Sequence, residues 1–598
     1  MDNIQQIVKC NICARECGIK EGGAGFCRKY TAVDGDLHEI APDKYLVVCC
    51  ISIETMPMQH FYPGGKFLQI TTTGCNFDCL GCVSTVVVKE MGIDSTALQY
   101  MTAEQIVEKA IEENCIGITF LMNDPIASFF TFLNVAKKAR ASNLMVGCSS
   151  NGYFTAESSQ QLAPYLDFIN IGIKGFSDEE YQACGAAGFK PVLESIKTFI
   201  GAGTHVEVSC TYKKYDEPGI GKFAAWLTES DYNIPLQIMR YIPLEEAAPE
   251  FEPTINEAEC LCRALKQTLN HVYLFNSPGT EYLNTYCPEC GNVLIARDFY
   301  GPMGAKTKKI NSSSEGKCLQ CNNLISIPGL QPRDGYKEKA FEGGYPFTRA
   351  LEMIQAILIA SGVVKLSDVV KVWEKILSEE NGLDNLHLDL NSISRYISVI
   401  QKFTSYIGAD EKAKKLTLYM QEKINQINEK LVNAAFRPRV YYAMGKPLFC
   451  LKGERFENQL VTAAGGVSVN KEVQGDGRPG LTISVEELNR LNPEVIFISS
   501  FISNTIEDFY RECLTKGIKV DAVRSKRIIN HSYPNWDFGS PRWILGLMNI
   551  ANILHPEMFS FDMLEEAKYF YSTFYNTDFD PERINLSFAK PVNNWRWK

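Results

Sequence analysis

The chain has 598 residues, which is enough for about three or four domains. Its composition is that of a globular protein, with 45% apolar, 22% charged and 11% aromatic residues. A formal net charge of −10 disfavours general binding to nucleic acid or to a membrane surface. The N-terminal stretch lacks the basic and apolar regions of a signal peptide. We therefore expect a cytoplasmic protein whose 21 cysteines are thiols or metal ligands rather than disulfides.

Residues 1–50 are predicted to form a cysteine-rich segment. Glycines around Gly23 would let the backbone fold tightly around an ion. The pattern leaves three interpretations open, namely a zinc site, a second iron–sulfur cluster and scattered free thiols. The four cysteines of this group are Cys10, Cys13, Cys17 and Cys27.

Residues 51–282 alternate short apolar runs with amphipathic helical stretches such as TAEQIVEKAIEE. Such alternation predicts parallel strands joined by right-handed helical crossovers. Six such units would make an open, partial (β/α)6 barrel rather than a closed barrel of eight. The predicted strands are 67–73, 116–122, 144–149, 168–173, 205–210 and 236–241.

Directly after the first predicted strand come Cys75, Cys79 and Cys82, in the stretch GCNFDCLGC. Three thiolates can hold three irons of a cubane iron–sulfur cluster and leave the fourth iron open to another ligand, whereas ordinary clusters use four cysteines. A structural zinc site with a distant fourth ligand is the alternative. Functional loops gather at the carboxyl ends of parallel strands, which is where this triplet is expected.

Residues 283–330 carry a third cysteine group, Cys287 and Cys290 in CPEC and Cys318 and Cys321 in CLQC. Two such knuckles on separate turns predict a zinc-ribbon-like module, with an iron–sulfur site or two unrelated buried pairs as alternatives. The other cysteines are interpreted as small buried apolar residues. They include Cys49, Cys50, Cys115, Cys148, Cys184, Cys260, Cys262, Cys450 and Cys513.

Residues 331–400 have mainly helical periodicity, for example in KLSDVVKVWEKIL. A long helix is predicted over 410–435, within a region that spans 401–598. After it the α/β alternation resumes, with strand-like runs RVYYAMG and EVIFISSF. FENQLVTAAGG reads as a helix that stops at its glycines, and SPRWILGLMNIANIL as a closing helix.

Residues 8–328 resemble the radical SAM superfamily, and within it the AmmeMemoRadiSam group, relatives of pyruvate formate-lyase activating enzyme. The resemblance is carried by IETMPMQHFYPGGKFLQITTTGCNFDCLGC, GITFLMNDP, SSNGYF, INIGIKGFSDEEY and NSPGTEYLNTYCPEC. It implies a [4Fe-4S] cluster on Cys75, Cys79 and Cys82, with S-adenosyl-L-methionine (SAM) bound across the carboxyl edge of the sheet. Reductive cleavage of SAM would give methionine and a 5′-deoxyadenosyl radical that abstracts a hydrogen atom.

The resemblance also implies residues that contact SAM, and here the chain departs from the usual pattern. Members place an aromatic residue before the third cysteine, where this chain has Gly81, so Phe77 is left to pack on the adenine. The usual Asn-Glu-Pro segment is Asn123-Asp124-Pro125, and of an Asp-x-Lys pattern only Lys174 remains. Asn151 also matches. Asn123 and Asn151 have an alternative role as turn residues that cap loops.

Residues 401–598 resemble the second half of periplasmic binding proteins of the iron-siderophore and cobalamin type. The match rests on ENQLVTAAGGVSVN, SVEELNRLNPEVIFIS and SPRWILGLMNIANILHPEMF. It implies a lobe that holds a metal chelate, a tetrapyrrole or another cofactor, although no first lobe of that type is recognisable. Residues proposed for ligand contact, which otherwise pack a loop against the last helix, are His531, Tyr533, Trp536, Asp537 and Arg542.

The sequence thus predicts a radical SAM enzyme that acts on a small cofactor or chelate held by the C-terminal lobe. Two alternatives stay open, a glycyl-radical activase acting on a protein partner and a non-catalytic carrier or sensor of iron. The cofactors implied are a [4Fe-4S] cluster and SAM, with zinc or a second iron–sulfur cluster in the outer cysteine groups. A one-electron reductant such as ferredoxin or flavodoxin is the implied partner, with no nucleic acid and no membrane.

Overall fold

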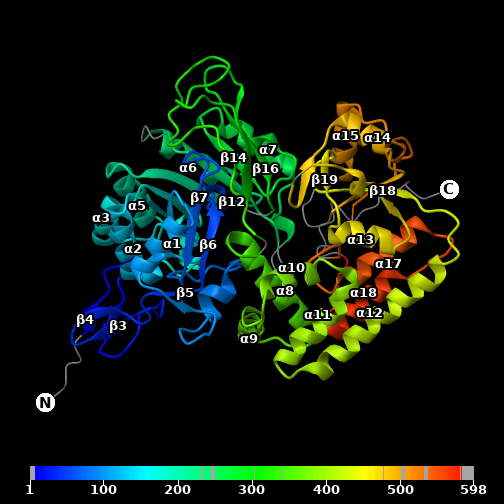
Figure 1. Ribbon diagram of the computed structural model, residues 1–598, viewed down its shortest axis with the longest axis horizontal. Helices are drawn as coiled ribbons and strands as arrows, with labels where there is room; N and C mark the ends of the chain where they lie inside the picture. The colour runs from blue at the N-terminus through cyan, green and yellow to red at the C-terminus, as the bar shows by residue number, and fades with distance from the viewer. Residues whose placement is uncertain are drawn as a thin grey trace.

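An eight-stranded sheet organises the N-terminal half of the protein (Figure 1). The structure is a computed structural model that describes residues 7–229, 233–243, 249–301, 304–339, 341–475, 477–499, 505–530, 536–579 and 581. The strand order is β14-β13-β12-β11-β10-β9-β7-β6, with all neighbours parallel except the antiparallel pair β6 and β7. The strands are β6 Val47–Ser52, β7 Lys66–Thr71, β9 Gly117–Phe120, β10 Met145–Ser150, β11 Phe168–Ile173, β12 His205–Tyr212, β13 Leu236–Arg240 and β14 Val272–Phe275.

All six predicted strands are present, and the sheet is open as expected, but the count of six parallel strands was too low. The seventh parallel strand is β14, a run of four fully buried residues. Such a short apolar run has no alternation that separates a strand from a buried turn of helix. The antiparallel edge strand β6 was also missed, because its hairpin partner β7 begins 14 residues after β6 ends and no tight-turn signal joins them.

Six helices, one in each crossover of the parallel strands, cover one face of the sheet. On β7 the side chains of Leu68 and Ile70 join the core shared with these helices, whereas Gln69 and Thr71 lie on the other face. This period-two pattern gives an apolar outer face and a polar inner face. The helices are α1 Ala103–Glu112, α2 Phe129–Ala141, α3 Ala156–Leu162, α5 Lys190–Gly201, α6 Glu217–Glu229 and α7 Ile255–Leu265.

The amino ends of the strands are closed by a buried polar network, which we call the barrel floor. The Glu207 carboxylate accepts hydrogen bonds from the backbone of Gln59 and His60 at 2.7–3.0 Å. Gln237 Nε2 donates to the same carboxylate at 2.6 Å. The His60 ring lies 2.5 Å from the Tyr273 hydroxyl, and Glu207 itself is fully buried. The segment before β7 therefore seals this end of the barrel.

The N-terminal segment forms two hairpins that dock beside the sheet. The first pairs β1 Ile7–Lys9 with β2 Gly18–Lys20, and the second pairs β3 Tyr30–Val33 with β4 Asp36–Glu39. A backbone bridge joins Cys13 to Phe154, just beyond β10. The cysteine-rich segment therefore lies against the carboxyl end of the sheet.

The ribbon module is a three-stranded antiparallel sheet with a small core of its own. Its strands are β15 Thr285–Tyr286, β16 Val293–Phe299 and β17 Ala305–Ile310. The two cysteine knuckles follow β15 and β17, so the hairpin brings them together as the spacing predicted.

The next region is helical, as predicted, and its helices cover the open side of the barrel (Figure 1). A single hydrophobic core contains Val47 of β6, Phe275 of β14 and the apolar faces of these helices. Helix α9 also packs on the short π-helical turn Val86–Glu90 that follows the cysteine triplet. Beyond this turn, Ser95 donates a hydrogen bond to Glu374 of α9. The helices are α8 Gly344–Ala360, α9 Leu366–Leu377, α10 Gly382–Leu390, α11 Ile393–Tyr406 and α12 Asp410–Leu431.

The C-terminal lobe is a second α/β unit, in line with the predicted resumption of alternation. Its sheet has the order β21-β19-β18-β22-β23, in which β18, β22 and β23 are parallel and β20 pairs with β18. The strands are β18 Arg439–Ala443, β19 Phe449–Leu451, β20 Val467–Ser468, β21 Gly480–Thr482, β22 Val495–Ile498 and β23 Ile528–Asn530. The flanking helices include α13 Phe456–Ala463, α14 Val485–Leu491, α15 Ile506–Lys516, α17 Trp543–Leu554 and α18 Met563–Phe570.

The two sheets meet at their carboxyl edges. Lys446, just after β18, forms an ion pair with Glu259 of α7 at 2.7 Å, and both side chains are largely buried. A Cβ added at Gly279, just after β14, would lie 2.9 Å from Lys446 Cβ, so the two loops are in close contact. Among the described residues, no helix is long and apolar enough to cross a bilayer.

Candidate functional site

The cysteine triplet occupies a loop at the carboxyl end of β7, as the sequence predicted. The chain leaves the strand at Thr71 and turns at Gly74, whose φ of +89° favours glycine. A Cβ at Gly74 would lie 2.8 Å from the Lys29 side chain, so the close approach of the N-terminal segment also requires glycine there. The loop then carries Cys75, Cys79 and Cys82, which are all half-buried.

Asn123 follows β9 and is fully engaged in holding this loop. Its Oδ1 accepts a hydrogen bond from the Thr72 backbone at 3.0 Å. Its Nδ2 donates to Thr72 Oγ1 at 2.9 Å and to the Gly74 carbonyl at 3.1 Å. Because the side chain is buried and both amide hydrogens are used, its place fits the loop-capping alternative for this residue.

Asp124 and Asn151 tie the next two strands to the same loop. The Asp124 carboxylate accepts hydrogen bonds from the Asn151 backbone at 2.6 Å and from Ser150 Oγ at 3.0 Å. Burial raises the pKa of Asp124, and these hydrogen bonds and the Lys174 charge oppose that shift. Asn151 Nδ2 donates to Asn76 Oδ1 at 2.7 Å and lies 3.9 Å from Cys75 Sγ. Residues at the carboxyl ends of β9 and β10 thus hold the loop that follows β7 in place.

The three thiols of the triplet interact, yet they are spread more widely than ligands of a single ion. Burial raises the pKa of Cys75, and the charges of Cys79 and Cys82 add to that shift. Among the described residues, only the ribbon cysteines bring three ligand atoms within 4.8 Å of one another. In a cubane cluster each thiolate binds a different iron, so its sulfurs stand farther apart than around one ion. The donor set therefore fits a cluster better than zinc.

Lys174 follows β11 and presents its ammonium group at the same edge. The side chain is exposed, and its charge acts on Cys79 and Cys82. A Cβ added at Gly172 would lie 3.2 Å from the Lys174 Nζ, so the ammonium group lies close to the end of β11. Lys174 is thus placed to meet an anionic group above the cluster loop.

The structure brings a fourth thiol to the triplet, which corrects the interpretation of Cys184 as a buried apolar residue. Cys184 follows α4 (Asp178–Ala183) and is half-buried, and its carbonyl accepts a hydrogen bond from the Asp78 backbone at 3.0 Å. Its thiol also contacts the thiol of Cys79. This contact raises the pKa of Cys79 and lowers that of Cys184 to about 7. Spacing along the sequence could not reveal it, because 105 positions separate the two residues. Cys260, interpreted in the same way, is exposed.

Phe77, predicted to pack on adenine, lies below the loop surface. Only 5% of the side chain is exposed, and its ring meets Tyr153 and Tyr181 edge-on at centroid distances of 5.1 and 6.0 Å. These contacts make it part of the support of the loop. Gly81, at the position where an aromatic residue is usual, has a φ of +71° and no atom near its absent Cβ, so the space there is open.

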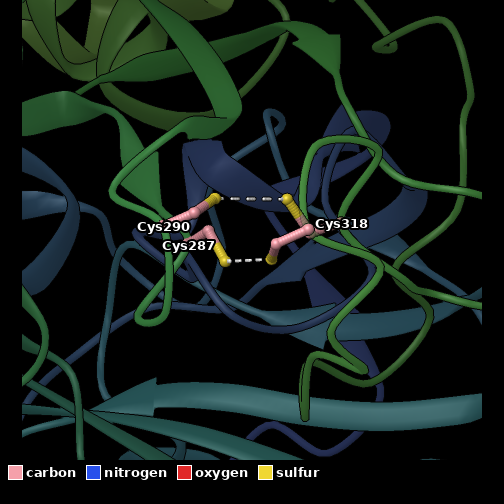
Figure 2. Close-up of side chains that lie close together, drawn as sticks. Cys287, Cys290 and Cys318 are labelled. Atoms are coloured by element: carbon pink, nitrogen blue, oxygen red, sulfur yellow. Dashed lines mark hydrogen bonds between the residues drawn. The ribbon is translucent and has the colours of Figure 1, made fainter.

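The ribbon cysteines form a compact tetrad (Figure 2). Cys287 Sγ lies 3.6 Å from Cys321 Sγ, and Cys290 Sγ lies 3.8 Å from Cys318 Sγ. A tetrahedral zinc ion with Zn–S bonds of about 2.3 Å holds its sulfurs about 3.8 Å apart. Backbone N–H groups of Cys321 and Gln320 lower the pKa of Cys318 to about 7, which favours the thiolate that a metal needs. The tetrad therefore fits one metal ion.

The N-terminal quartet also gathers in space, with wider spacing than the ribbon. The Cys10 backbone donates to the Cys17 carbonyl at 2.8 Å, and a Cβ at Gly25 would lie 3.8 Å from Cys17 Sγ. Burial raises the pKa of Cys13, and the charges of the other three thiols add to the shift.

In the C-terminal lobe, three of the five proposed contact residues can be placed. Trp536 is buried in the core shared with the helices, as packing would require. Asp537 is buried and accepts a hydrogen bond from Ser499 Oγ at 2.6 Å, just beyond the carboxyl end of β22. The Arg542 guanidinium lies 4.0 Å from the Tyr575 ring centroid. His531 and Tyr533 lie outside the described residues.

Comparison with known proteins identifies the domain that carries the triplet. Residues 70–213 match the Radical SAM superfamily, which confirms that expectation over this range. A curated relative is the uncharacterized protein MJ0808 of Methanocaldococcus jannaschii. It is 33% identical over 328 residues, which cover 54% of this chain and 95% of the relative. Neither match tests the pyruvate formate-lyase activating enzyme subgroup, which stays a prediction.

Solved structures with similarity to this chain include binding proteins. One is a periplasmic solute binding protein from Veillonella parvula DSM 2008, 20% identical, with a TM-score of 0.30 over 33% of this chain and 63% of that chain. Another is Helicobacter pylori CeuE with Ni(II) bound, 21% identical, with a TM-score of 0.29 over 34% of this chain and 68% of that chain. The chain thus spans about two thirds of the length of each.

Proposed function

We propose, because the chain belongs to the family of this archaeal relative and carries a radical SAM domain, that it cleaves SAM reductively and directs the radical to a small ligand. The ligand is a cofactor or metal chelate held at the carboxyl edge of the C-terminal lobe. The cluster would be held by Cys75, Cys79 and Cys82. A cluster in this loop supplies the electron that splits SAM into methionine and a hydrogen-abstracting deoxyadenosyl radical.

The protein's part in this reaction is to hold and orient. Asn123 and Asn151 fix the cluster loop through hydrogen bonds from neighbouring strands. Lys174 offers an ammonium group to the SAM carboxylate, and a charge-assisted hydrogen bond of this kind is short and directional. In the part of the chain that the structure describes, the barrel floor closes the amino end, which helps to keep water from the reacting groups.

The observation that carries the choice of substrate is the meeting of the two sheets at their carboxyl edges. Lys446 at the end of β18 pairs with Glu259, and Gly279 after β14 touches the same loop. Ligands of open α/β sheets bind beyond the carboxyl ends of the strands. A ligand bound at the carboxyl edge of the C-terminal sheet would therefore face the carboxyl edge of the barrel sheet, where the loop of Cys75, Cys79 and Cys82 begins.

The covered side of the barrel supports a small ligand over a protein partner. Residues of β6 and β14, the two free edges of the sheet, are buried in one core with α8 and α9. A partner protein would have to displace these helices to insert a peptide from that side. The remaining edge faces the C-terminal lobe across the largely buried Lys446–Glu259 contact, which favours a small molecule over a folded partner.

The proposal is tested with protein reconstituted anaerobically with iron and sulfide, then given dithionite and SAM. We expect 5′-deoxyadenosine from the native chain and none from a Cys75, Cys79 and Cys82 to Ala variant. Lys174→Ala should keep its iron and lose most SAM cleavage, whereas Lys222→Ala, an exposed lysine on α6, should keep both. Equal cleavage by Lys174→Ala and native protein would contradict the assigned role. Iron retention with no cleavage by any variant would favour the carrier alternative.

The substrate class is tested in the same assay with candidate metal chelates and tetrapyrroles. A true substrate should raise the yield of 5′-deoxyadenosine. When it is deuterated at the reacting carbon, it should transfer deuterium to that product. Stimulation by a glycyl-radical protein instead of small ligands would favour the activase alternative.

A further inference from the structure

The N-terminal quartet differs from the ribbon in the spacing of its thiols. The backbone brings Cys10, Cys13, Cys17 and Cys27 together. The Cys10 N–H donates to the Cys17 carbonyl at 2.8 Å, and Gly25, two residues before Cys27, packs against Cys17, whose Sγ would lie 3.8 Å from an added Cβ. No three of them bring their sulfurs within 4.8 Å of one another, although the ribbon cysteines do so without a metal. The same wider spacing is found in the triplet of the cluster loop, within the described residues. The quartet is therefore less compact than the ribbon, and the larger separation of thiolates in an iron–sulfur cluster is compatible with it.

The quartet is docked directly on the cluster loop. Arg15 Nη2, two residues after Cys13, donates to the carbonyl of Asn76 at 3.2 Å, and Asn76 adjoins Cys75. The Ala14 backbone donates to the Tyr153 carbonyl at 3.0 Å. The contacting residue Arg15 is two positions from Cys13, and its partner Asn76 is one position from Cys75. The two cysteine groups are therefore neighbours.

A buried lysine lies between the two cysteine groups. Lys29, two residues after Cys27, donates from Nζ to Thr73 Oγ1 at 2.6 Å, two residues before Cys75. The side chain is only 9% exposed and forms no ion pair within 4.0 Å in the part of the chain that the structure describes. Buried ammonium groups are normally paired with negative charge. The Glu39 carboxylate acts on Lys29 from beyond ion-pair distance, and metal-bound thiolates on both sides would add negative charge that neutral thiols do not.

We propose that Cys10, Cys13, Cys17 and Cys27 hold a second iron–sulfur cluster, which passes electrons to the cluster on Cys75, Cys79 and Cys82. The relay rests on the proposed radical SAM function, while the presence of the second cluster does not. A low-potential one-electron donor of the ferredoxin or flavodoxin class reduces the quartet cluster by one electron. That electron then moves to the neighbouring cluster, which returns the quartet cluster to its oxidised state. Lys29 lies between the two anionic centres and lowers their mutual repulsion.

The second cluster is tested by metal analysis and electron paramagnetic resonance of the full chain. The Cys75, Cys79 and Cys82 to Ala variant should keep about four irons and four sulfides and give a signal on reduction. A further change of Cys10 and Cys13 to Ser should remove them. A Cys287→Ser and Cys290→Ser control in the triplet variant should lose zinc and keep iron. Zinc in place of iron at the quartet, or no metal there, would overturn the proposal.

Spin coupling provides a readout that does not depend on variants that fold poorly. Reduced native protein should show a broadened signal that differs from the sum of the two single-cluster variants, because the clusters are neighbours. A native spectrum equal to that sum would overturn the close placement of the two clusters.

The relay is tested by comparing two reductants. With Lys29→Met and with the quartet variant, the ratio of flavodoxin-driven to dithionite-driven SAM cleavage should fall relative to native protein. An unchanged ratio would overturn the relay. Native protein that yields no 5′-deoxyadenosine with either reductant would refute the proposed function, while the iron count of the triplet variant would still decide on the second cluster.

Discussion

The two ends of the barrel use buried polar side chains for opposite purposes. At the amino end, the Glu207 carboxylate accepts from the His60 backbone, and the His60 ring bonds to the Tyr273 hydroxyl. At the carboxyl end, Asn123 and Asn151 form hydrogen bonds to the loop of Cys75, Cys79 and Cys82, whose half-buried thiols remain free to bind a metal. At both ends, therefore, the buried polar side chains hold backbone segments in place. The groups proposed to bind the cluster and SAM are the half-buried thiols and the exposed Lys174 that this support presents.

The largest stability effect is expected at the floor. Glu207→Ala removes one acceptor and leaves the Gln59, His60 and Gln237 donors without it. Each buried group left unpaired costs about 1–3 kcal/mol, so the free energy of unfolding should fall by about 3 kcal/mol or more. Chemical denaturation measures this change. The folded variant should still bind iron at the triplet, and a variant that is stable but has lost that iron would break the comparison.

A smaller loss of stability is expected from a change at the carboxyl edge of the barrel sheet. Asn151→Ala removes the hydrogen bond to Asn76 and should lower the free energy of unfolding by about 1–2 kcal/mol. The iron content of the reconstituted protein should fall as well, because the cluster loop loses a support next to Cys75. Asn385→Ala, on the surface of α10, provides a matched control. If both variants bind iron equally, the support role of Asn151 is wrong.

The effect that is smallest at neutral pH, because it develops only in acid, also belongs to the floor. The His271 ring packs edge-on against the His60 ring of the floor, at a centroid distance of 4.2 Å. Burial lowers the pKa of His60 well below its ordinary value and that of His271 to about 4. The unfolded chain protonates these rings near pH 6.5, whereas the folded protein does so only at lower pH. Their contribution to stability is therefore complete above pH 6.5 and is lost as the pH falls toward 4. Thermal melting of His271→Gln should show a weaker decline over this interval, and an identical decline would count against the assignment.

Much of the site could be predicted from the sequence because its signals are local. The Cys-x3-Cys-x2-Cys loop follows an apolar run, and a loop in that position must leave the carboxyl end of a strand. The ribbon cysteines likewise follow two short strands of one hairpin sheet. Both placements were confirmed, because neighbouring residues alone determine them.

The parts that were missed depend on contacts between distant segments. Cys184 reaches Cys79 only because β11 and β7 end at the same edge of the sheet. Lys29 reaches Thr73 only because the N-terminal hairpins dock there. Strand β14 is too short for its period to be recognised. None of these features has a pattern in its own stretch of sequence.

The core that runs from β6 and β14 through α8–α12 into the C-terminal lobe also limits how the chain can be divided. Cutting near residue 330 would expose the apolar edge residues Val47 and Phe275 to water, and such surfaces promote aggregation. The halves therefore depend on each other for solubility. Calorimetry of the whole chain should show their melting coupled rather than two independent transitions. Any ligand that tightens the lobe would, by the same linkage, raise the melting temperature of the catalytic half.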